Sequence, residues 1–185
     1  MEDNTQLRAE FEANISEKDL MDFKIYHNYH SFGGVMGLLF GIIALVIFAL
    51  TVSNDSVNVS YKLMMIFFGC MFTVYTPISM KLKAKQQIKT VSIFKAPVRY
   101  TVTEEKIVLS QGEVSEDLLW DDIFKIKFTG KSIVMYITSV RANIIPIRDI
   151  GTQADAFIAI AEKKLKPFQV KVSMDKLKKA VERIR

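Results

Sequence analysis

Two long uncharged runs, separated by only ten residues, constrain the fold of this chain most strongly. Residues 33–52 and 63–80 contain no Asp, Glu, Lys or Arg. As helices they would be about 30 and 27 Å long, close to the hydrocarbon thickness of a bilayer. The alternative is a pair of buried core helices in a soluble protein. We predict a two-helix transmembrane hairpin, with spanning helices over residues 32–53 and 62–80 and an external loop over residues 54–61.

The two runs differ in how strongly they favour the membrane. The first contains twelve Leu, Ile, Val or Phe residues, which together favour insertion by about 4–7 kcal/mol before polar corrections. The second contains only seven such residues. It is interrupted by Thr73, Tyr75, Thr76, Pro77 and Ser79. We therefore expect the second run to enter the membrane as the partner of the first.

The basic residues that flank the two runs predict their orientation. Lys81, Lys83 and Lys85 directly follow the second run, and Lys18 and Lys24 precede the first. The predicted external loop contains no basic residue, and Lys62 follows it at the membrane edge. Because Lys and Arg are retained on the inner side of the membrane, both termini are expected in the cytoplasm. We expect a multi-pass protein of the cell (cytoplasmic) membrane, with Lys81, Lys83 and Lys85 as candidate membrane-surface contacts.

Residues 1–31 are expected to form an N-terminal strand and an interfacial helix. Apolar and polar residues alternate over residues 6–14, which predicts the strand. Ser16 and Asp19 have the spacing of a capping box, which predicts a helix that runs to His30 and continues into the first span. An isolated strand would leave its backbone groups without partners. We therefore expect the strand to complete the sheet that later residues form.

After residue 86 the pattern changes to short strands. From Val98 onward, apolar and polar residues alternate in short runs with turn signals between them, which predicts an antiparallel meander. An apolar stripe from Ala154 to Leu165 predicts a helix that closes the sheet. Residues 86–165 are therefore predicted to form an α+β domain, an antiparallel β-sheet closed by a C-terminal helix. Trp120 is expected to anchor its core rather than to serve as a ligand platform.

Several short motifs occur in a distinctive order along the chain. Ser16-Glu-Lys-Asp19 and Tyr26-His-Asn-Tyr-His30 precede the first apolar run. After the second run, Trp120-Asp-Asp-Ile123 enters one strand and Ile144-Ile-Pro-Ile-Arg148 closes another. In this arrangement the chain resembles the YcxB-like family of bacterial membrane proteins. The resemblance implies a cytoplasmic pleckstrin-homology-like (PH-like) domain and no established biochemical activity.

The resemblance also indicates where a PH-like domain would bind inositol phosphates. Such domains do so through basic residues on their first hairpin. The turn that we expect to correspond to it is Thr103-Glu-Glu-Lys106, which is largely acidic. Binding of inositol phosphates is therefore not expected at this turn.

The sequence contains no recognisable set of catalytic residues. It has no zinc-protease helix motif, no phosphate-binding glycine loop and no nucleophile elbow. His27 and His30 could face the same way on a helix, but a metal site needs further ligands, so we interpret them as interfacial residues. The acidic pairs Glu116-Asp117 and Asp121-Asp122 are interpreted as solvated turn residues. We expect no catalytic residue, no metal and no cofactor, and hence no enzyme.

Gly33, Gly37 and Gly41 recur at every fourth position of the first run. This spacing places them on one face of a helix, where the absence of side chains lets another helix approach closely. One interpretation is packing against the second span, where Gly69 and Thr73 offer small surfaces. The other is the seam of a homodimer.

Residues 166–185 are predicted to form a basic amphipathic tail. From Lys163 to Arg185 the chain has nine basic and two acidic residues. Such a helix could lie on anionic lipid, or it could dock on its own domain with a solvated basic rim. The lack of interleaved aromatic residues disfavours nucleic acid. The candidate membrane-surface contacts are Lys176, Lys178, Lys179 and Arg183.

Together these patterns favour a protein that acts by binding. We expect a non-enzymatic integral membrane protein whose cytoplasmic PH-like module binds a partner protein or the inner-leaflet surface. The alternative is a small transport or self-protection (immunity-type) factor against a membrane-active compound. The absence of charged residues from both runs argues against an ion or proton pathway.

Overall fold

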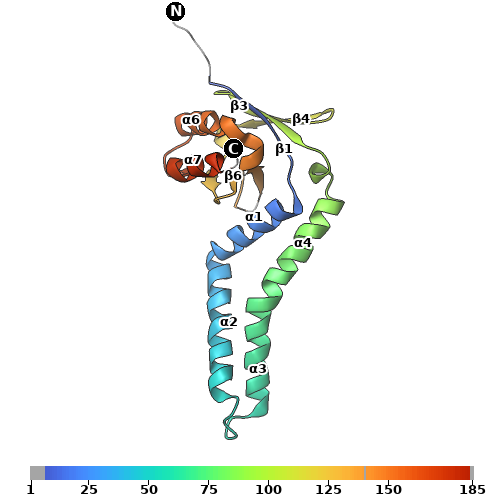
Figure 1. The fold of residues 1–185 in the computed structure, drawn as a ribbon, viewed down its shortest axis with the longest axis vertical. Coiled ribbons are helices and arrows are strands. Elements are labelled where there is room, and N and C mark those ends of the chain that lie inside the picture. Colours follow the sequence, from blue (N-terminus) through green and yellow to red (C-terminus); the bar gives the residue numbers. More distant parts are fainter. Residues whose placement is uncertain (1–6, 140, 184–185) are drawn as a thin grey trace, which may run out of the picture. The chain divides into compact units, whose positions relative to one another are not determined.

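The computed structural model describes residues 7–139 and 141–183, which form an α+β protein of two compact units (Figure 1). The first unit combines the chain up to Phe23 with the chain from Gln87 onward, and we call it the α+β unit. The second, residues 24–86, is helical. The helical unit is thus inserted into the sequence of the α+β unit.

The helical unit is a hairpin of two long apolar helices. The helices before and within it are α1 (Glu17–Tyr29), α2 (Phe32–Thr51), α3 (Val59–Cys70), the π-helical segment η1 (Met71–Tyr75) and α4 (Thr76–Thr90). Helices α2 and α3 run side by side along their length (Figure 1). By length and composition, Phe32–Thr51 and Val59–Thr90 are both able to cross a membrane.

The expected continuous helix through His30 into the first span is wrong. α1 ends at Tyr29, and Ser31 takes an extended conformation with φ −94° and ψ 148° as the N-cap of α2. The Ser31 hydroxyl oxygen accepts a hydrogen bond from the Gly34 N–H at 3.1 Å. The sequence Ser31-Phe-Gly-Gly34 therefore favours a new helix start over continuation of the old helix.

The second long helix contains a widened turn in its middle. The π-helical segment ends just before Thr76 and Pro77. Because proline has no N–H and its ring collides with the carbonyl four residues earlier, a regular α-helix cannot pass through it unchanged. The Thr76 hydroxyl donates to the Met71 carbonyl at 3.1 Å, so a side chain supplies a hydrogen bond to the widened turn.

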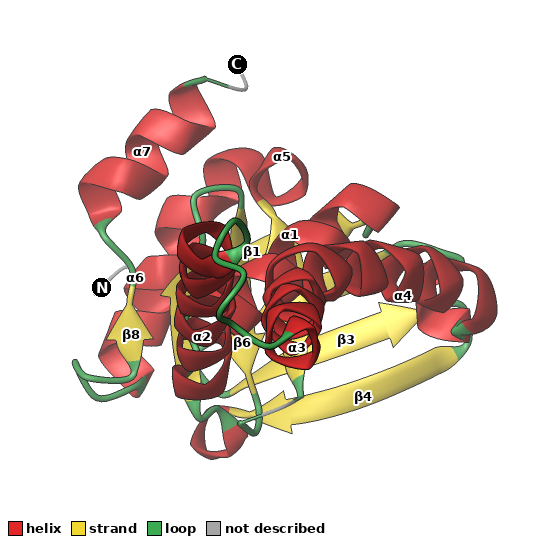
Figure 2. Cartoon of the chain, turned by 90° about the horizontal axis from the view of Figure 1, so that it is seen from below, coloured by secondary structure: helices red, strands yellow, loops and turns green. Residues whose placement is uncertain are grey.

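Four antiparallel strands form the first sheet of the α+β unit. Their order is β1 (Ala9–Ala13), β2 (Val98–Val102), β3 (Lys106–Gln111) and β4 (Val114–Leu119). Strands β3 and β4 lie side by side as a long hairpin (Figure 2). The predicted pairing of the N-terminal strand is confirmed, because β1 pairs with β2 from Ala9↔Val102 to Ala13↔Val98. Gln6, the first residue of the predicted strand, lies outside the described residues.

The single meander that we predicted is divided into two sheets. The second sheet has the order β7 (Ala142–Pro146), β6 (Ser132–Tyr136), β5 (Lys125–Phe128) and β8 (Val170–Lys171). The division falls at the short helix η3 (Trp120–Asp122), where the buried Trp120 donates from Nε1 to the Thr103 carbonyl at 2.9 Å. This anchor ends β4 and redirects the chain into the second sheet. The sheet is also not wholly antiparallel, because β8 pairs in parallel with β5.

One helix closes the core, as predicted. It is α6 (Ala154–Lys164), which follows the short helices α5 (Ile147–Ile150) and η4 (Gly151–Gln153). Phe157, Ile158 and Ala161 are fully buried in a cluster that also contains Trp120, which confirms the predicted apolar stripe and the core role of the tryptophan. Phe11 of β1 stacks on Tyr100 of β2, with ring centroids 5.1 Å apart, and meets the edge of Phe157 at 6.2 Å.

The tail forms β8 and the helix α7 (Met174–Glu182). Leu177 is fully buried, and the partly buried Met174 and Val181 pack against the same core. The last two residues, 184 and 185, lie outside the described part of the chain. The apolar side of the tail helix is therefore docked on its own domain.

Removing the ring of Phe11 tests whether β1 is an integral part of the core. We expect Phe11→Ala to lower the free energy of unfolding of the α+β unit by about 3–5 kcal/mol, because a large buried ring is lost. Thermal unfolding of the full chain, followed by fluorescence of the single tryptophan, Trp120, measures the change. The matched control is Glu12→Gln on the outer face of the same strand, where the exposed Arg99–Glu12 pair is worth at most about 1 kcal/mol. Equal losses in both variants would contradict the prediction.

Candidate functional site

Two glycines of α2 lie against the second long helix. A Cβ atom added at Gly41 would stand 2.9 Å from both Phe72 Cβ and Thr73 Cγ2, and one added at Gly69 would stand 2.5 Å from Leu45 Cδ2. At Gly37 the nearest atom, Phe72 Cδ1, would be 3.3 Å away. At Gly33 no atom lies within 4 Å of the added Cβ. The structure thus uses Gly37 and Gly41 for packing within the hairpin and leaves open space at Gly33.

These two environments make Gly41 and Gly33 a matched pair for mutation. Gly41→Val should destabilise the hairpin by about 1–3 kcal/mol, since neither helix can move apart without losing contacts. Gly33→Val places the same side chain in open space and should cost much less. Unfolding of the full chain in mixed micelles, followed by circular dichroism, compares them. If Gly33→Val proved the more destabilising, the two helices of the hairpin would not pack through Gly41.

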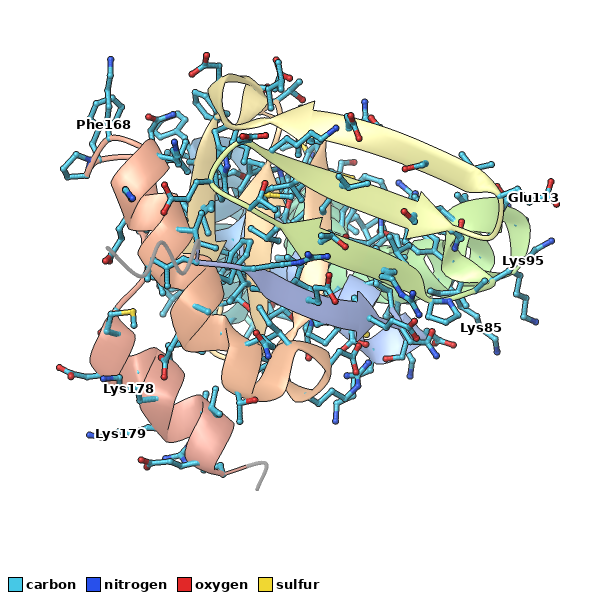
Figure 3. The ribbon with its side chains drawn as sticks, turned by 90° about the horizontal axis from the view of Figure 1, so that it is seen from above. Lys85, Lys95, Glu113, Phe168, Lys178 and Lys179 are labelled. Carbon is cyan, nitrogen blue, oxygen red and sulfur yellow. The ribbon has the colours of Figure 1, made fainter. Side chains whose placement is uncertain are left out.

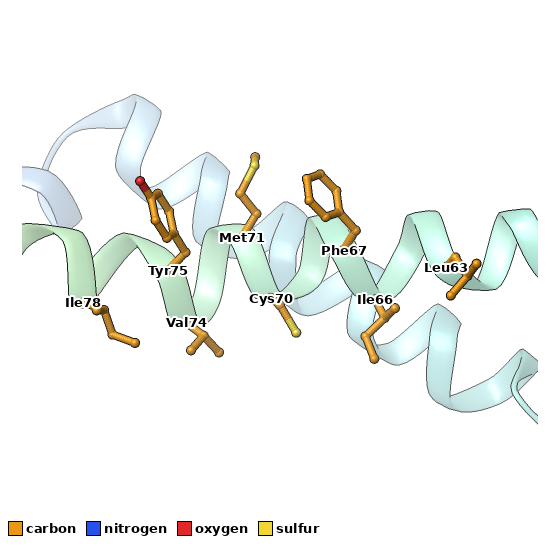
Figure 4. A pocket seen from close by; sticks show the side chains of 8 residues that line it. All are labelled: Leu63, Ile66, Phe67, Cys70, Met71, Val74, Tyr75 and Ile78. Atoms are coloured by element: carbon orange, nitrogen blue, oxygen red, sulfur yellow. The ribbon is translucent and has the colours of Figure 1, made fainter.

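An apolar groove runs along the second long helix (Figure 4). Its lining residues recur at intervals of three and four, which places them on one side of that helix. They are Leu63, Ile66, Phe67, Cys70, Met71, Val74, Tyr75 and Ile78. None of them is among the residues that the glycines of α2 approach. The groove has no titratable pair and offers a surface for apolar chains rather than for chemistry.

Most of α2 is also left uncovered by the chain itself. Of its twenty residues, only Gly41 and Ala44 are buried. The core helix of a soluble protein would be covered by other elements. A helix of this composition, with half of its residues exposed and only two buried, matches the first span that the sequence predicts.

The best-defined polar cluster joins the turn after β1 to α5, and we call it the Arg148–Asp19 clasp. Arg148 donates to both carboxylate oxygens of Asp19, at 2.7 and 2.6 Å, and to the Asn14 carbonyl at 2.9 Å. The Asp149 carboxylate accepts from the Asn14 N–H at 2.9 Å. Ser16 donates to Asp19 from its backbone N–H and its hydroxyl, which is the predicted capping pair. The clasp therefore holds the first turn of α1 on the domain.

The electrostatics of the clasp favour the charged form of Asp19. Burial raises the pKa of the Asp19 carboxyl, but hydrogen bonds from Arg148 and Ser16 and the charge of Arg148 outweigh it. The net result is a pKa below the usual value. The Asp19 side chain is only 7% exposed, while that of Arg148 is 44% exposed. The clasp is thus a half-buried pair, bidentate on the carboxylate side.

This shift predicts how the stability of the α+β unit depends on pH. A folded-state pKa below the unfolded one means that Asp19 contributes stability at neutral pH, and the contribution is lost as pH falls below about 5. We expect Asp19→Asn to cost about 1–3 kcal/mol at neutral pH, and the difference from the natural chain to shrink in acid. Urea unfolding of both chains between neutral pH and pH values below about 5 measures this difference in the free energy of unfolding. Arg148→Lys keeps the positive charge but loses the bidentate hydrogen bonds to Asp19. Its free energy of unfolding should lie between those of the natural chain and Asp19→Asn. Parallel pH profiles for natural and Asp19→Asn chains would contradict this account.

The two histidines and the acidic pairs lie apart from the clasp. His30 Nδ1 lies 2.9 Å from the Tyr26 carbonyl oxygen, and its ring stacks on that of Tyr26 at 4.0 Å. Lys106 pairs with Asp117, and Arg141 pairs with Glu116. Asp121 and Asp122 are exposed in η3. In the described part of the chain, no three His, Cys, Asp or Glu side chains converge as metal ligands would.

The acidic turn Thr103–Lys106 is the second turn of its sheet, not the first. It joins β2 to β3, whereas β1 and β2 are joined through the apolar helices. Glu104 is held by Lys163 of α6 at 2.8 Å from both carboxylate oxygens, and this hydrogen bond lowers the pKa of Glu104. The predicted pairing of the N-terminal strand with β2 is what makes this turn the second connection of the sheet.

The predicted membrane-surface lysines are exposed where the structure describes them. Lys81, Lys83 and Lys85 are exposed on α4. On α7, Lys178 and Lys179 project outward from the domain (Figure 3). Lys176 and Arg183 are also exposed. Docking of the apolar side of α7 therefore leaves its basic side free to meet another surface.

The fold and these sites define an α+β protein with two candidate membrane-crossing helices and a clasped strand–helix junction. Residues 102–161 form a YcxB-like domain, since the family model described as YcxB-like protein matches them. The match runs from the end of β2 into α6 and covers less than half of the chain. No curated protein and no solved structure matches this chain.

Proposed function

We propose that this protein is a non-enzymatic integral membrane protein whose PH-like domain faces the cytoplasm and binds a partner protein or the inner-leaflet surface. The observation that carries the proposal is the position of the two apolar helices between β1 and β2, neighbours in one sheet. Through this insertion the domain is joined to the hairpin at two points of the chain. Such a domain cannot leave the membrane, and its surfaces are held near the bilayer.

The PH-like assignment is supported by three features. The YcxB-like match lies within the domain, β2 to β4 and β5 to β7 each form an antiparallel meander in its own sheet, and α6 packs in the core with residues of both sheets. The binding mode of inositol phosphates on a first hairpin has no counterpart here, because β1 and β2 are not joined by a hairpin. Recognition is therefore assigned to the outer surfaces of the domain.

The use of polar groups favours binding over catalysis. Among the described residues, Asp19 and Ser132 are the buried polar or charged ones, and Asp19 is committed to the clasp. Other acidic residues form exposed ion pairs on the sheets, as Glu12 does with Arg99 and Asp117 with Lys106. Such exposed pairs contribute at most about 1 kcal/mol each, and they engage these carboxylates at solvent-facing positions of the strands.

The apolar groove on the second long helix favours a second candidate function. A membrane-active compound or its acyl chain could lie along this groove, as in a small transport or self-protection factor. Crosslinking in native membranes separates the two functions. A discrete captured protein supports the binding module, whereas capture of lipid or amphipathic peptide alone, with altered sensitivity to such compounds on deletion, supports the second.

Accessibility of engineered cysteines tests the orientation on which the proposal depends. In a Cys70→Ser background, Ser56→Cys in the loop between the helices should react in intact cells with a reagent that cannot cross membranes. Glu113→Cys on the β3–β4 turn should react only after the membrane is opened. Both positions are exposed, which makes them a matched pair. Labelling of position 113 in intact cells would rule out a cytoplasmic domain.

A further inference from the structure

Three lysines share one face of the second sheet. The parallel pairing of β5 with β8 sets Lys127 beside Lys171, and Lys125 lies two residues earlier on the same side of β5. Ile126, between the two β5 lysines, is fully buried in the core, so the lysines lie on the opposite face. We call Lys125, Lys127 and Lys171 the β5–β8 lysine surface.

One exposed aromatic ring, that of Phe124, borders this surface, and a second, Phe168, lies in the turn before β8. Lys125 Nζ lies 4.8 Å from the ring centroids of both Phe124 and Tyr136. Phe124 is 52% exposed, and Phe168 is 68% exposed and projects from the turn before β8 (Figure 3). Gln169 holds that turn beside β5 by donating to the Ile123 and Phe124 carbonyls at 2.9 and 3.2 Å. Lysines with neighbouring exposed aromatic rings are typical of surfaces that meet a membrane interface.

The positive charges of this surface are close enough to repel one another. Burial, followed by the charges of Lys125 and Lys171, lowers the pKa of Lys127. The ion pairs of the described residues do not include Lys125 or Lys171. An anionic partner would relieve this repulsion, and charge complementarity therefore defines the chemistry of the occupant.

The same region of the sheet also receives α1. Phe23 of α1 meets Tyr136 at 6.3 Å between ring centroids, and Asp22 pairs with Lys131 on the β5–β6 turn at 2.7 Å. Nine positions after Phe23 comes Phe32, the first residue of the first candidate span. Only a short stretch of chain therefore separates the part of α1 that contacts this sheet from the first candidate span.

We propose that the β5–β8 lysine surface, bordered by Phe124, binds the anionic lipid headgroups of the membrane that holds the helical hairpin. The inference rests on the proposed function and names the inner leaflet as the partner of this face. Each lysine near an anionic surface strengthens association by a factor of about five. Three lysines would thus shift the ratio of docked to undocked domain by about a hundredfold.

The test uses the full chain, with Cys70→Ser, in lipid nanodiscs. A fluorophore is attached at Lys166→Cys, in the turn that carries Phe168, and the lipids carry a spin-labelled headgroup that quenches it. Quenching should rise when phosphatidylglycerol is added to phosphatidylcholine and fall as salt is raised. A fluorophore at Glu113→Cys, on the other sheet, should show no such rise. Equal quenching with and without phosphatidylglycerol would overturn the proposal.

Two charge variants assign the effect to this surface. Lys125→Gln, Lys127→Gln and Lys171→Gln together should abolish the rise caused by phosphatidylglycerol. The matched control combines Lys176→Gln, Lys178→Gln and Lys179→Gln on α7. It removes the same amount of charge and should still show the rise in quenching caused by phosphatidylglycerol. Unchanged Trp120 fluorescence and melting show that both variants are folded. If the α7 variant lost the rise in quenching, alone or as fully as the β5–β8 variant, the assignment to the β5–β8 lysine surface would be overturned.

Failure of the lipid-binding proposal can be distinguished from failure of the proposed function. If Glu113→Cys is labelled in intact cells, the cytoplasmic module itself is excluded. If the orientation holds and quenching ignores lipid charge, only the lipid assignment fails, and an acidic segment of a partner protein becomes the occupant to test.

Discussion

The ladder of backbone hydrogen bonds between β1 and β2 is the interaction on which the rest of the structure depends. It joins residues 9–13 to residues 98–102 and so closes a loop that contains both apolar helices. Closing a flexible loop of this length costs about 4 kcal/mol of entropy. The buried side chains of β1, above all Phe11 against Tyr100 and Phe157, offset that cost.

The Arg148–Asp19 clasp complements the ladder at the point where the chain leaves the sheet. The ladder fixes the N-terminal strand, and the clasp fixes the direction in which α1 departs from it. Asp22 and Phe23 extend the contact along α1 to the β5–β6 turn and to β6. Helix α1 is therefore joined to the domain by charge, by hydrogen bonds and by aromatic packing over its first two turns.

Several elements with a clear local periodicity or spacing were predicted, as was the pairing of β1 with the distant sheet, whereas the break between α1 and α2 at Ser31 and several distant contacts were missed. Three local patterns predicted elements that the structure contains. They are the alternation around Phe11, the spacing of Ser16 and Asp19 in a capping pair, and the helical spacing of Phe157 and Ala161. The break at Trp120 was missed because it depends on a hydrogen bond to Thr103, and β8 was missed because two residues carry no pattern. The partner of Asp19 lies 129 positions away, beyond any local signal.

The insertion of the helices between neighbouring strands has a kinetic consequence during synthesis. β1 leaves the ribosome first, and its partner β2 follows more than eighty residues later, about 4–17 s at ordinary elongation rates. During that interval β1 is an unpaired edge with a backbone able to pair with any nearby strand. Glu10 and Glu12 lie on the outer face of the strand, where charged side chains disfavour pairing with another strand edge both before β2 arrives and in the finished sheet, of which β1 forms one edge.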